Sequence, residues 1–581
     1  MSRQTTNNDG KILIAGGAQN NANCDVNMSG TQTYEVSMMR DRPDEVELEA
    51  ATTSAKPERP MISIQQFHTK EGMLVKVTPP REPTQLKTAH VPCDIVLVLD
   101  VSSSMNAMAT IIDEKGGPNM NTGYTVLDIV KQVARTIVQT LHENDRLGIV
   151  TFSQTAHVLQ SLQPVAGADK DGIKNEIHRL KSQRGTNLWD GVKTGLTLFN
   201  ANLNTDRVPA LMVLTDGEPF DEPIKGYADA LRAQGPLPAS IYTLGFGDHI
   251  KSAVLSTIAE IGGGYYGFIP NSQVVCTVAA HAVAHIRSTF ATTCHLELRV
   301  PHSATGLTMS TDQVLVTNQE QQLFAGTSWS FPLGNLHYGQ SRDIYLRFNG
   351  TSGSKIHIEA RLTQPYTKGF KHVEAFSVWA APPSTLSEDE MSFHRKRNQI
   401  CELILMLFPQ DSQGSFIETS NRAKRINWFE TFVQRLGVAN HNDKGNNLLI
   451  EQIQGHIRDA VYAHDEKWKT WGRHYLMSVW FAHAKQLRTS FLDPGVEMYD
   501  DDSPLFLECQ NRLFEAFRHQ VPTPQPSQPD KADPSFSSGS RTLNMTSYDG
   551  TSLKGSRKAF QSTPSSSGKQ FIHWEVLERN V

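Results

Sequence analysis

The alternation of apolar and polar residues divides the chain into segments with different periods. Largely apolar runs at 95–100, 146–152, 210–215 and 240–245 alternate with helical patterns at 126–143, 169–181, 227–234 and 273–289. Such runs are typical of strands buried on both faces. Strands that alternate with helices indicate right-handed crossovers. Residues 93–291 are therefore predicted to form an α/β domain with a doubly wound, mainly parallel sheet.

The flanks of this domain have a period of two. Short alternating runs at 295–300, 313–317, 343–348 and 355–362 are separated by Gly, Asn and Ser. This pattern predicts an antiparallel β-sandwich domain over 292–383. Because runs at 61–67 and 73–78 have the same character, we expect 60–92 to supply strands to that β-domain. The α/β domain would then be an insertion in it.

The pattern turns helical over 384–520, which predicts a helical domain. It opens with a capping box at 387–390, and the aromatic residues between 468 and 481 have a spacing typical of helix packing. Residues 1–59 and the Pro- and Ser-rich tail 521–581 have too few apolar residues to offset the entropy of ordering, so disorder is predicted for both. A strand-like stretch, 571–576, interrupts the tail.

Oxygen-bearing side chains follow two of the predicted strands. The run 95–99 leads into Asp100, Ser102 and Ser104; the run 210–214 leads into Asp216, and Thr186 precedes a helical pattern. In a parallel α/β sheet, ligands bind outside the carboxyl ends of the strands, so these segments are expected to meet. Carboxylate and hydroxyl oxygens suit a hard cation such as Mg²⁺.

Taken singly, each motif is typical of a turn or a helix cap; in this order and placement they predict a metal site. The combination resembles the von Willebrand factor A family and its metal-ion-dependent adhesion site. The resemblance implies that Ser102, Ser104 and Thr186 are hydroxyl ligands of Mg²⁺ or Mn²⁺. It implies that Asp100 and Asp216 act mainly through water. Ser103 stands where the family often has Gly, which leaves the ligand set intact.

Segments 91–100, 143–150, 471–476 and 491–496 resemble a fungal group of intracellular A-domain proteins. In many of these the chain continues into a hedgehog/intein-type module, and plant relatives are coupled to RING-type ubiquitin ligases. After Cys509 this chain has no Cys and only a low-complexity tail. We therefore expect the chain to lack that module, since splicing needs a folded pocket around a nucleophile.

Composition narrows the function classes. The net charge is −5 over 581 residues and basic residues are scattered, so no nucleic-acid surface is expected. The six Cys stand singly, which disfavours a zinc module or a disulfide framework. No run approaches a membrane span and no signal region begins the chain. A cytoplasmic location follows as the expectation, with the nucleus as the alternative.

Catalytic motifs are not found in the sequence. His281 and His285 lack the Glu of a zinc protease between them, and the glycines at 245–247 and 262–264 lack the Lys of a phosphate-binding loop. We expect a non-enzymatic scaffold whose metal binds an Asp or Glu of a protein partner. Two alternatives stay open: a component of a ubiquitin-ligase pathway that acts with a separate catalytic subunit, and an ion that only stiffens the loops.

Overall fold

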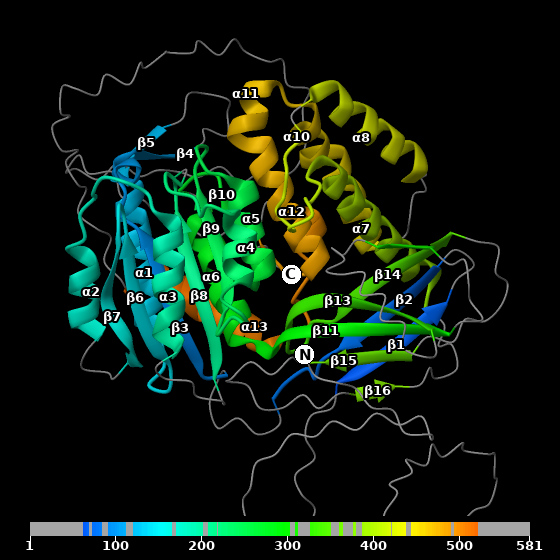
Figure 1. The fold of residues 1–581 in the computed structure, drawn as a ribbon, viewed down its shortest axis with the longest axis horizontal. Helices are drawn as coiled ribbons and strands as arrows, with labels where there is room; N and C mark the ends of the chain where they lie inside the picture. Colours follow the sequence, from blue (N-terminus) through cyan, green and yellow to red (C-terminus); the bar gives the residue numbers. More distant parts are fainter. Residues whose placement is uncertain are drawn as a thin grey trace, which may run out of the picture. The chain divides into compact units, whose positions relative to one another are not determined.

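The computed structural model describes sixteen stretches of the chain (Figure 1). They are residues 62–68, 72–83, 91–111, 120–165, 170–200, 207–217, 219–272, 274–301, 308–311, 326–349, 359–363, 376–378, 386–419, 421–436, 443–489 and 493–520. The two ends predicted to be disordered, 1–59 and 521–581 with its strand-like stretch 571–576, lie outside the described residues.

A six-stranded sheet forms the centre of the α/β domain, in the order β10-β9-β8-β3-β6-β7. Its strands are β3 (Cys93–Asp100), β6 (Arg146–Phe152), β7 (Ala156–Pro164), β8 (Val208–Thr215), β9 (Ser240–Phe246) and β10 (Gly263–Ile269). All neighbours are parallel except the edge pair β6 and β7. Every residue of β3 is buried, because helices cover both faces of this central strand.

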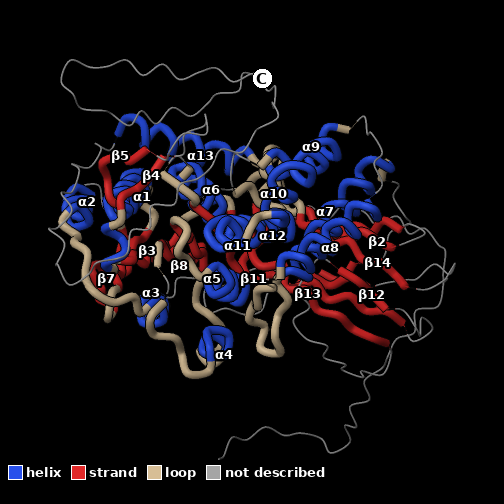
Figure 2. The backbone as a smooth tube through the Cα atoms, turned by 90° about the horizontal axis from the view of Figure 1, so that it is seen from above, coloured by secondary structure: helices blue, strands red, loops and turns tan. Residues whose placement is uncertain are grey.

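Helices lie on both faces of the sheet. Figure 2 shows α1 and α6 on one side and α3, α4 and α5 on the other. The helices in the described part of the domain are α1 (Val126–Thr140), α2 (Lys170–His178), α3 (Leu188–Asn200), α4 (Gly226–Arg232), α5 (Ser252–Ile261) and α6 (Val275–Arg287). Helix α1 begins with a complete capping box between Thr125 and Asp128, which satisfies two of the free amide groups of its first turn. A short hairpin of β4 (Met108–Ile111) and β5 (Met120–Thr125) precedes it.

Two antiparallel sheets form a sandwich beside this domain. One has the order β1-β2-β14-β12 and the other the order β13-β11-β15-β16. Their bounds are β1 (Ser63–His68), β2 (Gly72–Thr78), β11 (Thr289–Pro301), β12 (Thr308–Thr311), β13 (Gly326–His337), β14 (Arg342–Asn349), β15 (Glu359–Thr363) and β16 (Phe376–Val378). Leu74 of β2 lies opposite Tyr345 of β14, and Figure 1 shows these distant segments side by side. The segment before the α/β domain therefore pairs with strands that follow it.

The C-terminal described part is helical. It contains α7 (Glu388–Leu407), α8 (Arg422–Leu436), α9 (Lys444–Gln452), α10 (Arg458–Tyr462), α11 (Asp465–Lys467), α12 (Arg473–Lys485) and α13 (Pro504–Glu515), with η3 (Ile453–Ile457), η4 (Trp468–Gly472), η5 (Pro494–Val496) and η6 (Ala516–Gln520). Buried residues of α12 and α13 belong to the same hydrophobic cluster as the strands of the α/β sheet. Nearly all of α12 is buried, which explains why it is apolar around most of its circumference.

The predicted fold class is confirmed: an α/β domain with a mainly parallel sheet, further antiparallel sheets and a helical C-terminal region. The domain boundaries themselves stay predictions. Two strands of the sheet were not predicted, and both lie at its edges. Strand β7 has exposed residues at alternate positions over part of its length. Strand β10 begins at Gly263, within the glycines 262–264, a composition typical of turns.

Candidate metal centre

The loop after β3 folds back on the last residue of that strand. Asp100 accepts a hydrogen bond from the backbone N–H of Ser102 at 2.7 Å. This contact turns the chain so that the hydroxyls of Ser102 and Ser104 lie 2.8 Å apart. The short helix η1 (Ser103–Asn106) then leads the chain away. One carboxylate and two hydroxyls are thus held together at the carboxyl end of the central strand.

Strand β8 delivers the second carboxylate to the same place. The Ser104 hydroxyl donates to Asp216 Oδ1 at 2.8 Å. The Ser102 hydroxyl shares its hydrogen bond with Ser104, in which either oxygen can be the donor, and it is also a hydrogen-bond partner of Asp100. The lone pairs of the serine oxygens that these bonds do not use stay available to a cation.

Thr186 reaches the cluster from the loop before α3. A Cβ placed on Gly217 would lie 3.2 Å from Thr186 Cγ2, 3.4 Å from Ser104 Oγ and 3.6 Å from Asp100 Oδ2. Gly217 is therefore surrounded by three of the predicted site residues. Gly185 fixes this approach: its φ is +89°, and an added Cβ would lie 2.8 Å from the Gln154 backbone. The structure thus brings all five predicted site residues together, while their role as ligands stays a prediction.

The two carboxylates are poorly solvated. Asp100 is fully buried and Asp216 is 7% exposed. Burial raises the pKa of Asp100 to about 6, against the hydrogen bonds from Thr215 and Ser102. Burial and the nearby Asp100 charge raise the pKa of Asp216 to about 7. Within the described part of the chain, no ion pair joins either carboxylate to a Lys, Arg or His. Two buried acids that lack a cationic partner are the electrostatic setting that a bound cation would relieve.

Thr215 is a site residue that sequence reasoning missed. Its hydroxyl donates to Asp100 Oδ2 and accepts from the Gly217 backbone N–H at 3.2 Å. It therefore links the two strand ends and orients the carboxylate of Asp100. Its position directly before Asp216 was visible in the sequence, but its contact with Asp100 depends on β3 pairing with β8.

The donor set fits a hard cation better than a softer metal that prefers thiolate or imidazole ligands. Across the described residues, no cluster of three or more His, Cys, Asp or Glu could hold a metal. An ion at this site would rest on two carboxylates and three hydroxyls, which suits Mg²⁺ or Mn²⁺. Burial falls from Asp100 and Ser102 to half-buried Thr186 and exposed Ser104. The site is therefore open to solvent on the Ser104 side.

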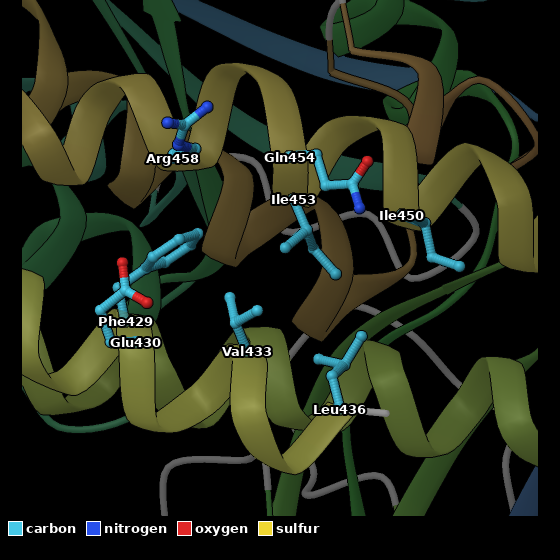
Figure 3. Close-up of a pocket in the computed structure, with 8 residues that line it drawn as sticks. All are labelled: Phe429, Glu430, Val433, Leu436, Ile450, Ile453, Gln454 and Arg458. Carbon is cyan, nitrogen blue, oxygen red and sulfur yellow. The ribbon is translucent and has the colours of Figure 1, made fainter. Parts of the chain in front are cut away.

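A separate groove of about 490 Å³ lies in the helical region. Figure 3 shows side chains of α8 facing those of α9, η3 and α10 across it. Its lining is mostly apolar: Phe429, Val433, Leu436, Ile450 and Ile453, with Gln454, Glu430 and Arg458. Glu430 and Arg458 both contact Tyr462, by a hydrogen bond and by a cation–π contact. The groove thus presents one carboxylate, which accepts a hydrogen bond from Tyr462, among mostly apolar side chains.

Two family models match the chain. Residues 94–278 match the von Willebrand factor type A domain, and residues 443–515 match the family "VWA / Hh protein intein-like". The expectation that a hedgehog/intein-type module is lacking is therefore wrong. That expectation relied on a nucleophile after Cys509, whereas the matched residues are mainly helices α9 to α13. The match contains one cysteine, Cys509, whose burial raises the pKa of its thiol to about 11.

Individual proteins resemble parts of the chain. The uncharacterized protein sll0103 of Synechocystis sp. is 29% identical over 219 residues, which cover 37% of this chain and 46% of that protein. The chain thus spans less than half of that relative. A von Willebrand factor type A protein from Catenulispora acidiphila has a TM-score of 0.48 at 15% identity, with 69% of this chain and 91% of that chain covered. The ArnB paralog VWA2 from Sulfolobus acidocaldarius has a TM-score of 0.38 at 16% identity, with 72% of this chain and 99% of that chain covered.

The described helices include none that is long and apolar enough to cross a membrane. The matched family model coincides with the α/β domain, and its first residue, Asp94, lies on the central strand β3. The second match covers most of the helical region that packs on this domain. The chain therefore contains a von Willebrand factor type A domain, followed by a region of the VWA / Hh protein intein-like family.

Proposed function

We propose that the A domain binds Mg²⁺ or Mn²⁺ at the end of β3 and uses the ion to capture an acidic residue of a protein partner. Ser102, Ser104 and Thr186 would supply hydroxyl oxygens, and Asp100 and Asp216 would act mainly through water. Such domains commonly mediate metal-dependent protein interactions. The observation that carries the proposal is the pair of buried carboxylates with raised pKa values in a cluster of hydroxyls.

The mechanism follows from incomplete ligation. If the three hydroxyls are neutral ligands and the acids lie one water away, the ion keeps part of its positive charge. Mg²⁺ keeps several waters in such sites, and the exposed Ser104 side leaves room for one that exchanges. A partner carboxylate would replace that water, so binding should require both the metal and an acidic residue.

Isothermal calorimetry of the full chain with MgCl₂ tests the proposal. Ser104→Ala removes an oxygen and should weaken Mg²⁺ binding at least tenfold, about 1.4 kcal/mol. Ser103→Ala is the matched control: it is the adjacent exposed serine outside the proposed set, and its affinity should equal that of the wild type. Equal affinity of Ser104→Ala and the wild type would reject the site.

We infer a binding role and no catalysis for this chain. The only thiol of the intein-like region is buried and held in its protonated form by the raised pKa, whereas a nucleophile needs the thiolate. The full chain should therefore remain intact during prolonged incubation with added thiol. The ubiquitin-pathway alternative stays a prediction, since no described feature favours it.

A further inference from the structure

Two apolar side chains are exposed on the loop that follows Asp216. Phe220 is 86% exposed and Ile224 is fully exposed at 105%. The other large exposed apolar residues of the described chain are Val158, Met406 and Ile417, each half-exposed at 43–50%. Removing a large apolar side chain from water is favourable, so two such residues four positions apart on one loop form a candidate contact surface.

Contacts to the candidate metal centre hold this loop in place. The backbone N–H of Phe220 donates to the carbonyl of Thr186 at 2.9 Å, so a hydrogen bond joins Phe220 directly to a proposed ligand residue. Asn187 donates to Asp221 at 3.4 Å, and the N–H of Gly226 closes the loop on the carbonyl of Pro223 at 2.7 Å. The exposure of Phe220 and Ile224 is therefore a property of an anchored loop.

The charges of the loop restrict what could cover it. Asp221 and Glu222 lie between the two apolar residues, and both are exposed. Lys251 pairs with Glu222 at 3.0 Å, while Asp221 accepts a hydrogen bond from the neutral amide of Asn187. A run of acidic residues on a partner would be repelled here. A partner segment with a single acidic residue and an apolar residue near it could bind the ion with the acid and contact Phe220 and Ile224 with the apolar side chain.

We propose that Phe220 and Ile224 form an apolar subsite that selects, among acidic partners, those with a large apolar residue one to three positions from the metal-binding Asp or Glu. This inference rests on the proposed function, because the acid at the ion places the partner. An extended segment of two or three residues spans about 7–10 Å, which suits a subsite bonded to a proposed ligand residue. Burial of one such partner side chain should change affinity about tenfold or more.

Fluorescence polarisation with the full chain and three labelled peptides tests this subsite. The peptides share a Gly/Ser background and carry Asp-Gly-Leu, Asp-Gly-Ser or four consecutive Asp. In Mg²⁺ the Asp-Gly-Leu peptide should bind at least tenfold tighter than the other two, and EDTA should abolish its binding. Phe220→Ser and Ile224→Ser should each lower the affinity for the Asp-Gly-Leu peptide several-fold and leave the affinity for the Asp-Gly-Ser peptide unchanged.

Controls separate this inference from the metal site. Ile417→Ser removes a half-exposed isoleucine of the helical region, and should change no peptide affinity. The loop variants should bind Mg²⁺ with wild-type affinity in calorimetry. Equal, EDTA-sensitive binding of all three peptides would overturn the subsite and leave the proposed function intact. Binding that survives EDTA, or the failure of every peptide to bind while Mg²⁺ binds, would contradict both.

Discussion

Buried aspartates at the two ends of the central sheet have different partners. At the amino end, Asp94 forms ion pairs with Arg146 and Arg207, and buried Asp145 pairs with buried Arg287 at 2.9 Å. At the carboxyl end, Asp100 and Asp216 have hydroxyl and backbone partners, and the described residues bring no cation to them. The amino end is neutralised by the chain itself, and the carboxyl end is left with charge that an external cation would balance.

This difference separates structural charge from charge kept for function. A buried ion pair within the fold contributes to a defined packing, because removal of one member leaves the other unpaired. A buried acid with a raised pKa costs stability when it ionises. The proposed cation, bound there, would account for the retention of two such acids side by side at a solvent-open site. Three predictions test the contrast, from the largest expected effect on stability to the smallest.

The largest effect is expected at the amino end. Asp145→Ala should lower the free energy of unfolding by about 3–5 kcal/mol, because Arg287 would stay buried without its partner. The same change removes the acceptor of the backbone N–H groups of Cys93 and His142. Urea denaturation of the full chain measures the loss. Asp171→Ala, which breaks an exposed pair with Lys174, should have little effect. A loss as small as that of this control would contradict the structural role.

The carboxyl end should respond to metal instead. Mg²⁺ at a hundred times its dissociation constant should stabilise the wild type by about 2.7 kcal/mol. Asp216→Asn should abolish this gain and yet be at least as stable as the wild type in EDTA, because it removes a buried charge that has no cationic partner. Thermal melting with and without Mg²⁺ measures both. If Asp216→Asn in EDTA is as unstable as Asp145→Ala, the aspartates at both ends of the sheet have the same structural role, and the contrast is wrong.

The smallest effect concerns the link between the two strand ends. Thr215→Val removes the hydroxyl that donates to Asp100 and accepts from Gly217. It should cost about 1 kcal/mol of stability and weaken Mg²⁺ binding about tenfold, because an orienting partner of Asp100 is lost. Thr215→Ser keeps the hydroxyl and should retain wild-type affinity in calorimetry. Equal Mg²⁺ affinity of the Val variant and the wild type would remove Thr215 from the site.

The parts predicted from sequence are those whose signal is local. A strand buried on both faces is apolar at nearly every position, so 95–100 and 146–152 were recognised, and β6 has the predicted bounds. The edge strand β7 was missed, since a partly exposed strand carries polar residues. The helices over 443–515 were predicted from their period. Their family was not predicted, because we expected an intein-like region to contain a nucleophile in a folded pocket.

Local sequence is enough to place the oxygen donors: Asp100, Ser102, Ser104 and Asp216 follow apolar runs, whatever the rest of the chain does. Which aspartates are neutralised depends on how the chain folds. Asp94 and Asp100 lie on the same strand, yet Arg207 reaches Asp94 from 113 positions away, and Arg287 reaches Asp145 from 142. The charge state of a buried group depends on its distance to other charges and on loss of water, and folding sets both.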